Sequence, residues 1–116
     1  MSTVAELDKK VNDAILNGKP TEAFEELYDE DVVMQENLEP EFRGKDFNRK
    51  REQEFLAAVE AIHSCKLLGS AVADDVTFSE WDMEITIKGV GRTRMSQVAV
   101  RHWKNGKVVH ERFYHK

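Results

Sequence analysis

The sequence predicts an α+β fold in which three helices come first, interrupted by one strand, and a run of antiparallel strands follows. Two observations support this. Apolar residues recur at helical intervals only in the first half of the chain, whereas the second half alternates with a period of two, as half-buried strands do. The pair Asn105-Gly106 also marks a tight hairpin between the last two strands. A sheet curved around the long third helix would leave a conical cavity at one end.

The first two helices are expected to form a hairpin. Thr3-Val-Ala-Glu6 has the spacing of a capping box, so the first helix begins there, and Asn17-Gly18 provides a left-handed stop. Pro20 suits the first turn of a short second helix. The apolar stripes consist of Val4, Leu7, Val11, Ala14 and Ile15 in the first helix, and of Ala23, Phe24, Leu27 and Tyr28 in the second.

A β-branched run from Val32 to Asn37 predicts the first strand. An irregular segment follows, with Pro40 and Gly44 as breakers. The third helix is expected from about Asp46 to His63. The remaining strands are expected at Lys66 to Ala73, Val76 to Lys88, Arg92 to Trp103 and Lys107 to His115.

The hairpin at Asn105-Gly106 also predicts a register. A two-residue loop pairs Trp103 with Val108, and counting back places Val100 opposite Glu111. We expect the core face to carry Val98, Val100, His102, Val109, Glu111 and Phe113. The opposite face then carries Gln97, Ala99, Arg101, Trp103, Val108, His110, Arg112 and Tyr114. A bulged turn would reverse these assignments on one strand.

The composition describes an ordinary globular protein that forms one domain, residues 1–116. The chain is 41% hydrophobic and 34% charged, and its net charge of −5 argues against a nucleic-acid partner. The start of the chain has no apolar signal core and no segment reaches a membrane-spanning length, so we expect no membrane partner. Cys65 is the single cysteine and cannot form an internal disulfide, which makes a reducing cytoplasm the expected location.

Glu36 and Glu111 are the candidate catalytic residues, because each is the lone acid on an otherwise apolar strand face. A carboxylate in such surroundings needs a raised pKa or a fixed partner, and two carboxylates in unequal environments can divide into a general acid and a general base. His102 lies diagonal to Glu111 and could carry a proton. The structural alternative is that Glu36 lies at a solvated strand end and that Glu111 pairs with Arg94 or another cation.

The walls of the expected pocket are apolar and suit a small, largely apolar ligand. They comprise Met34, Trp81, Met83, Val98, Val100 and Phe113. An aromatic–arginine set on the opposite face indicates a homodimer contact, formed by Arg101, Trp103, Arg112 and Tyr114. No metal-ligand spacing, phosphate loop or nucleophile elbow is present in the sequence, so we expect no cofactor.

Three segments give the chain a family resemblance: "NGKPTEAFEELYDEDVVMQE", "FRGKD" before the long helix, and "VRHWKNGKVVHERFY". In this order they resemble the nuclear transport factor two-like superfamily, and within it the SnoaL-like group. The resemblance implies a cone-shaped α+β barrel, a deep pocket between sheet and helices, and a dimer through the outer sheet face. Members include isomerases, polyketide cyclases, an epoxide hydrolase and dehydratases, so the fold alone does not assign a reaction.

Ketosteroid isomerase is the closest enzyme in this resemblance, and Glu36 falls at about the position of its catalytic base. Its oxyanion donors correspond approximately to Val11 and Val100, which cannot donate hydrogen bonds. The acid that polyketide cyclases use near the final strand corresponds to His115. Three hypotheses follow: a cofactor-independent isomerase, cyclase or hydrolase, a non-catalytic binder of a small ligand, or a dimerisation module.

Overall fold

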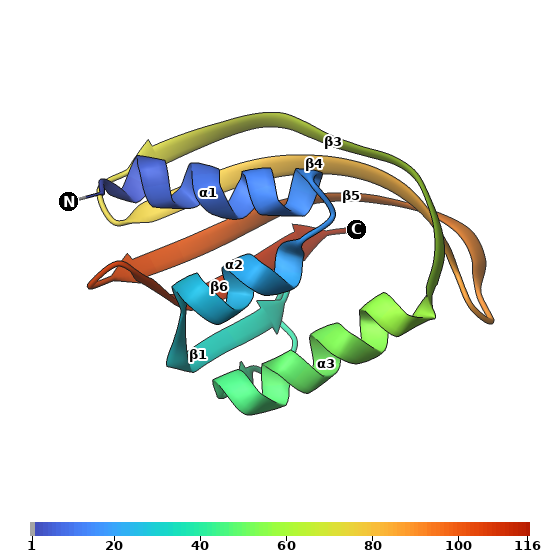
Figure 1. Ribbon diagram of the computed structural model, residues 1–116, viewed down its shortest axis with the longest axis horizontal. Helices are drawn as coiled ribbons and strands as arrows, with labels where there is room; N and C mark the ends of the chain where they lie inside the picture. Colours follow the sequence, from blue (N-terminus) through green and yellow to red (C-terminus); the bar gives the residue numbers. More distant parts are fainter. Residues whose placement is uncertain (1) are drawn as a thin grey trace.

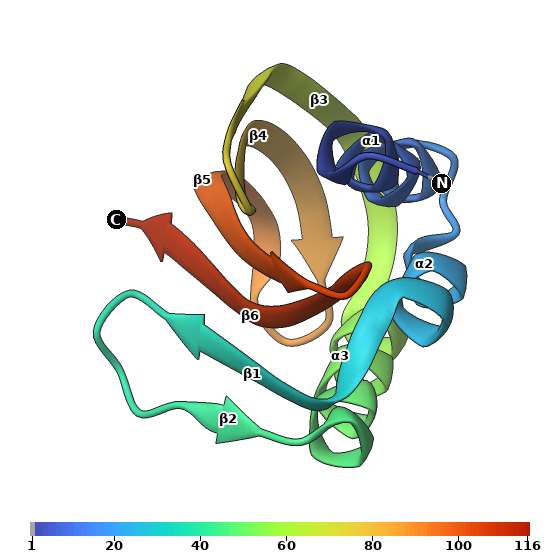
Figure 2. The ribbon, with the colours of Figure 1, turned by 90° about the vertical axis from the view of Figure 1, so that its left-hand side faces the viewer.

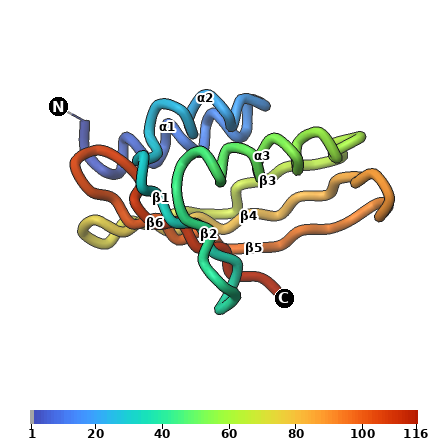
Figure 3. The backbone as a smooth tube through the Cα atoms, turned by 90° about the horizontal axis from the view of Figure 1, so that it is seen from below, coloured from blue at the N-terminus to red at the C-terminus, as the bar shows by residue number. Residues whose placement is uncertain are grey.

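The computed structural model describes residues 2–116, which form one curved six-stranded sheet with three helices on its concave side (Figures 1 and 2). The strand order is β2-β1-β6-β5-β4-β3. All neighbouring strands pair antiparallel except β1 and β6, which run parallel. The view from below shows the helices on one side of the strands (Figure 3). The predicted α+β class is therefore confirmed.

The N-terminal helical hairpin is also confirmed. Helix α1 spans Val4–Leu16, and both hydrogen bonds of the capping box are present between Thr3 and Glu6. Gly18 takes the left-handed conformation, with φ of 73°, at the stop between the helices. Helix α2 spans Pro20–Leu27, with Pro20 in its first turn. The apolar stripes of the two helices pack against the sheet.

Strand β1 spans Tyr28–Glu36 and begins directly at the end of α2. The segment that was expected to be irregular contains a two-residue strand β2, Phe42–Arg43, which pairs with β1. Helix α3 spans Lys45–Ala58. Strands β3 to β6 span Val59–Ala73, Val76–Ile87, Gly91–Lys104 and Lys107–His115.

The predicted end of the third helix was wrong. The helix ends at Ala58, five residues before His63, and β3 takes over at Val59. This part of β3 pairs with the end of β4, where Val59 lies opposite Ile87 and Cys65 lies opposite Met83. The β-branched residues of this stretch fit a strand well, and pairing with β4 satisfies the backbone groups that a longer helix would have bonded internally.

The register of the last hairpin shows one unforeseen irregularity. Asn105 and Gly106 form the expected two-residue loop, with φ values of 52° and 76°, and Trp103 pairs with Val108 as predicted. His102, which precedes Trp103 in β5, pairs with His110. Val109 is therefore an extra residue in β6, a β-bulge. From there on Arg101, and not Val100, lies opposite Glu111.

This bulge decides which face of β5 points inward. One extra residue in β6 reverses which side chains of β5 share a face with those of β6. The predicted faces of β5 were therefore wrong, and those of β6 were correct beyond the bulge. Ala99, Arg101 and Trp103 are at most 4% exposed and face the helices. Val98, Val100 and His102 lie on the outer face.

The hydrophobic core lies at one end of the molecule, beneath the helical hairpin. Its buried cluster comprises Val11, Ala23, Phe24, Leu27, Tyr28, Val32, Trp103 and Val108. At the other end the long strands β3, β4 and β5 extend past the helical hairpin, and only the second half of α3 lies near them (Figure 1). The side chains of this cluster fill the space between the sheet and the helical hairpin.

Candidate functional site

A cavity of about 430 Å³ lies between the concave face of the sheet and the three helices. Its walls are mostly apolar. The most exposed of its apolar residues, Leu16, Phe55 and Ile62, come from the end of α1, the last turns of α3 and the start of β3, and they mark the opening.

Six of the nine residues proposed from the sequence line this cavity. They are Met34, Glu36, Trp81, Met83, Glu111 and Phe113. Val98, Val100 and His102 do not, because the bulge at Val109 places them on the outer face. Their positions facing the cavity are taken by Gln97 and Arg101.

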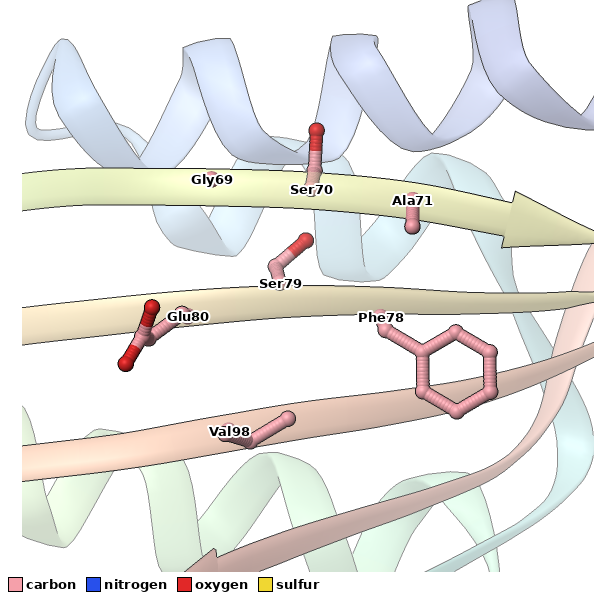
Figure 4. A pocket seen from close by; sticks show the side chains of 7 residues that line it. All are labelled: Gly69, Ser70, Ala71, Phe78, Ser79, Glu80 and Val98. Atoms are coloured by element: carbon pink, nitrogen blue, oxygen red, sulfur yellow. The ribbon is translucent and has the colours of Figure 1, made fainter.

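His102 is therefore not the partner of Glu111. Its ring is exposed and packs edge-on against His110 on the outer face, with 5.5 Å between the ring centroids. Val98 contributes to a shallow depression on the same face, beside Phe78 and Glu80 of β4 (Figure 4). The predicted dimer contacts Arg101 and Trp103 do not lie on this face, because both are buried on the inner side.

Arg101 is the centre of a buried polar network. Its side chain is 1% exposed, and its Nε donates a hydrogen bond to Oε2 of Glu111 at 2.7 Å. Its Nη1 donates to Oδ1 of Asp8 at 2.9 Å and to Oδ1 of Asn12 at 2.8 Å. Burial acts to lower the pKa of Arg101, but Glu111 and Asp8 are among the neighbours that raise it overall. The guanidinium therefore stays charged and ties α1 to two strands of the sheet.

Further side chains complete this network from the sheet. The hydroxyl of Thr77 donates to Asp8 at 2.7 Å and accepts a hydrogen bond from Nε1 of Trp103 at 2.9 Å. Asn12 donates to the hydroxyl of Ser79 at 2.9 Å. Within residues 2–116, every side-chain nitrogen or oxygen that is closed off from the surface has a hydrogen-bond partner. Such complete satisfaction makes a buried network rigid.

Glu111 has the fixed partners that its surroundings require. Besides Arg101, the hydroxyl of Tyr28 donates to the same Oε2 at 2.6 Å. Burial raises the pKa of Tyr28 well above its ordinary value of 10.0, and the negative charge of Glu111 raises it further, so the phenol stays protonated. Glu111 is thereby held in place, and it in turn holds the side chains of Arg101 and Tyr28.

Glu36 lies at the end of β1, beside the last residues of β6. Its Oε2 is 2.9 Å from Nε2 of His115, and the backbone N–H of His115 donates to Oδ1 of Asn37 at 3.0 Å. The side chains of Glu36 and His115 are 39% and 36% exposed. Glu36 thus lines the cavity but also contacts solvent, and it already has a partner.

Glu52 is the acidic residue that the sequence analysis missed. It lines the cavity from α3, and within residues 2–116 its carboxyl group forms neither a hydrogen bond nor an ion pair. Burial raises its pKa from 4.5 to about 7, and the negative charges of Glu111 and Glu25 add to this effect. A carboxyl group with this pKa is well suited to take up and release a proton near neutral pH.

A helical spacing could have identified Glu52. The residues of this part of the chain that line the cavity are Asn48, Arg51, Glu52, Phe55, Leu56 and Val59. They recur at intervals of three or four, as one face of a helix does. Because half of this face is polar, its pattern resembles a solvent-exposed face, and only the structure shows that it turns inward.

Neither a metal cluster nor a membrane-spanning helix is found in the described part of the chain. No group of three or more histidine, cysteine, aspartate or glutamate side chains in residues 2–116 is arranged to hold a metal ion. No helix in the same range is both long and apolar enough to cross a bilayer.

Comparisons with known proteins place the whole chain in one family. A family model described as a SnoaL-like domain matches residues 2–115. A solved structure from Mesorhizobium loti, a candidate SnoaL-like polyketide cyclase, is 28% identical and has a TM-score of 0.89, with 98% of this chain and 100% of that chain covered. No curated protein matches the chain.

Two more distant solved structures support the fold alone. A protein from Xanthomonas campestris with a cystatin-like fold is 13% identical, with a TM-score of 0.84 over 98% of this chain and 91% of that chain. A protein from Catenulispora acidiphila with a ketosteroid isomerase-like fold, solved with trimethylamine, is 16% identical. Its TM-score is 0.77 over 98% of this chain and 88% of that chain.

Proposed function

Because the chain belongs to the SnoaL-like domain family, we propose that it binds a small, largely apolar carbonyl compound and transfers a proton on it without a cofactor. One observation carries this proposal. Glu52 is a carboxyl group without a partner in residues 2–116, its pKa is raised to about 7, and it faces a largely apolar cavity of about 430 Å³. Such groups are typical of general acids and bases.

Arg101 supplies the hydrogen-bond donor that such a reaction needs. Its Nε and Nη1 are occupied, but Nη2 has no partner within residues 2–116. Arg101 is 1% exposed but lines the cavity, and Nη2 is its one nitrogen without a partner in that range. A fixed donor of this kind stabilises negative charge on an oxygen as it develops. Arg101 would take the place of the donor that is absent at Val11, since Val100 lies on the outer face and does not line the cavity.

In the proposed reaction, the Glu52 carboxylate removes a proton from the carbon next to a carbonyl group. The electron pair moves onto the carbonyl oxygen, where Nη2 of Arg101 stabilises it. Return of the proton to a different carbon gives an isomerisation. Attack of the enolate carbon on a second carbonyl group of the same substrate gives a ring closure, in which the proton held by Glu52 passes to the new alkoxide oxygen. Both outcomes need only one proton-exchanging group and one donor.

Glu36 and Glu111 have supporting roles in this proposal. Glu111 holds Arg101 through Nε and Tyr28 through its hydroxyl. Glu36 is paired with His115 and contacts solvent, so we assign proton transfer to Glu52 instead. The alternative is a non-catalytic binder, in which the same groups hydrogen-bond the polar end of a ligand.

Hydrogen exchange tests the proposal. Small cyclic and open-chain ketones are incubated with the protein in D₂O, and loss of the proton next to the carbonyl group is followed by NMR. We expect exchange with the wild type and a loss of roughly a hundredfold or more in Glu52→Gln, the scale of general acid–base catalysis. Glu54→Gln is the matched control, because Glu54 is an exposed residue of the same helix.

Two results would decide against catalysis by Glu52. Equal exchange rates for the wild type and Glu52→Gln would assign the proton transfer to another group. Binding of the ketones by the wild type with no exchange above the rate in buffer would favour the non-catalytic binder.

A further inference from the structure

Arg51 is a second functional group of the cavity that the proposed proton transfer does not use. It lies on α3 next to Glu52 in the sequence and lines the same cavity. Its guanidinium carbon lies over the ring of Phe42, 3.5 Å from the ring centroid. Its Nη1 donates a hydrogen bond to Oδ1 of Asn48 at 3.2 Å.

Two neighbours hold this guanidinium in one orientation. Asn48 is 1% exposed, and its Nδ2 donates to the backbone oxygens of Phe42 at 2.9 Å and Gly44 at 2.8 Å. The amide is therefore fixed by the start of α3, and its Oδ1 is aimed at Arg51. Stacking on Phe42 fixes the plane of the guanidinium. A side chain held in this way loses little further freedom when it binds a ligand.

Among the residues that the structure describes, 2–116, the charge of Arg51 has no direct partner. Within residues 2–116, no carboxylate oxygen lies within 4.0 Å of its nitrogens. Arg112 also has none but hydrogen-bonds Gln35 and Tyr114. At least one carboxylate partner is found for each of the other arginines, Arg43, Arg49, Arg92, Arg94 and Arg101. The negative charge of Glu36 acts on Arg51, but the Glu36 carboxylate is hydrogen-bonded to His115. In the described part of the chain, one of the five N–H groups of this guanidinium donates a hydrogen bond and four do not.

We propose that Arg51 binds a carboxylate group of the ligand, so that the substrate is a small apolar monocarboxylic acid whose body fills the cavity. A guanidinium with several free N–H groups binds a carboxylate through two parallel hydrogen bonds. Burial lowers the pKa of Arg51, although Glu36 acts to raise it. An anion in contact with the guanidinium offsets this cost of burial. The inference rests on the proposed function only in placing the ligand in the same cavity.

The surroundings favour a carboxylate over a phosphate. Glu36, Glu52 and Glu111 line the same cavity, so a second negative charge on the ligand would be repelled. The apolar walls also favour a ligand with a single charged group.

Binding of matched probes tests the inference without any turnover. The affinities of octanoate and octanamide, and of naphthoate and naphthamide, are measured by isothermal titration calorimetry at neutral pH. We expect the wild type to bind each carboxylate about tenfold or more tightly than its amide, the scale of hydrogen bonds to a charged group. Arg51→Gln should lose this preference, and Arg51→Lys should keep part of it. Arg43→Gln, an exposed arginine that does not line the cavity, is the matched control.

Three outcomes would overturn the inference. The wild type could bind both members of each pair equally, including no measurable binding of either at millimolar concentration. Arg51→Gln could keep the full preference while its circular dichroism spectrum remains that of the wild type. Phenyl phosphate could bind more tightly than benzoate. None of these results depends on Glu52, so they are independent of the hydrogen-exchange test.

Discussion

Replacement of Glu52 by glutamine should raise the free energy of unfolding at neutral and alkaline pH, but not at acidic pH. The pKa of Glu52 is raised from 4.5 to about 7 in the folded protein, so its ionisation opposes folding. Between these two values the folded protein binds more protons than the unfolded chain. The free energy of unfolding therefore falls as the pH rises from 4.5 to about 7 and is level above that.

The magnitude follows from the same pKa change. At about 1.36 kcal/mol for each tenfold change in proton affinity, the full rise corresponds to about 3 kcal/mol. Glu52 is only partly buried, and solvent screening reduces this to about 2 kcal/mol. Glutamine has a similar shape and does not ionise. The free energy of unfolding of Glu52→Gln should thus equal that of the wild type at about pH 4 and exceed it by about 2 kcal/mol at about pH 8.

Urea unfolding across this pH range, followed by tryptophan fluorescence, measures the difference. Trp81 and Trp103 are both buried, so their emission reports unfolding. Glu54→Gln is again the control and should show no such pH dependence. The reasoning would be refuted by a stability difference that does not change with pH, or by a carboxyl carbon of Glu52 that titrates near its ordinary value in NMR spectra.

Two further predictions concern the network and the outer face. Arg101→Met leaves Glu111 and Asp8 buried without their cation, so we expect the free energy of unfolding to fall by about 3 kcal/mol or more; a loss below about 1 kcal/mol in urea unfolding would contradict this. We also propose that the outer sheet face forms a homodimer, now through Phe78 and Val98 in place of Arg101 and Trp103. Analytical ultracentrifugation should show a dimer that Val98→Arg dissociates, and a monomeric wild type would exclude it.

The sequence was sufficient to predict those helix ends and turns that depend on a few neighbouring residues. The capping box at Thr3, the stop at Gly18, Pro20 and the Asn105-Gly106 loop each act within a few residues, and all four occupy the predicted positions. The resemblance to the family rested on three longer segments and on the order in which they occur. The boundary at Val59 had no such signal, because pairing with β4, more than twenty residues later in the chain, ends the helix.

The inner face of β5 could not be identified from the sequence for a different reason. An arginine facing a core is costly unless acids surround it, so Arg101 resembles a surface residue. The acids that compensate it come from α1, through Asp8, and from β6, through Glu111. The bulge at Val109 brings Glu111 opposite Arg101, and a stretch of three residues, Val108 to His110, fits either register.

Arg51 and Glu52 show how one helix can separate binding from chemistry. Adjacent residues on a helix point about 100° apart, so two neighbours can line one cavity at different places. Arg51 is held by Asn48 and Phe42, as a residue that orients a ligand must be. Glu52 has no such support in residues 2–116, and burial in an apolar wall raises its pKa, which opposes folding. A stabilising partner for Glu52 would lower that pKa and remove its ability to exchange a proton near neutral pH, so the instability belongs to the proposed activity itself.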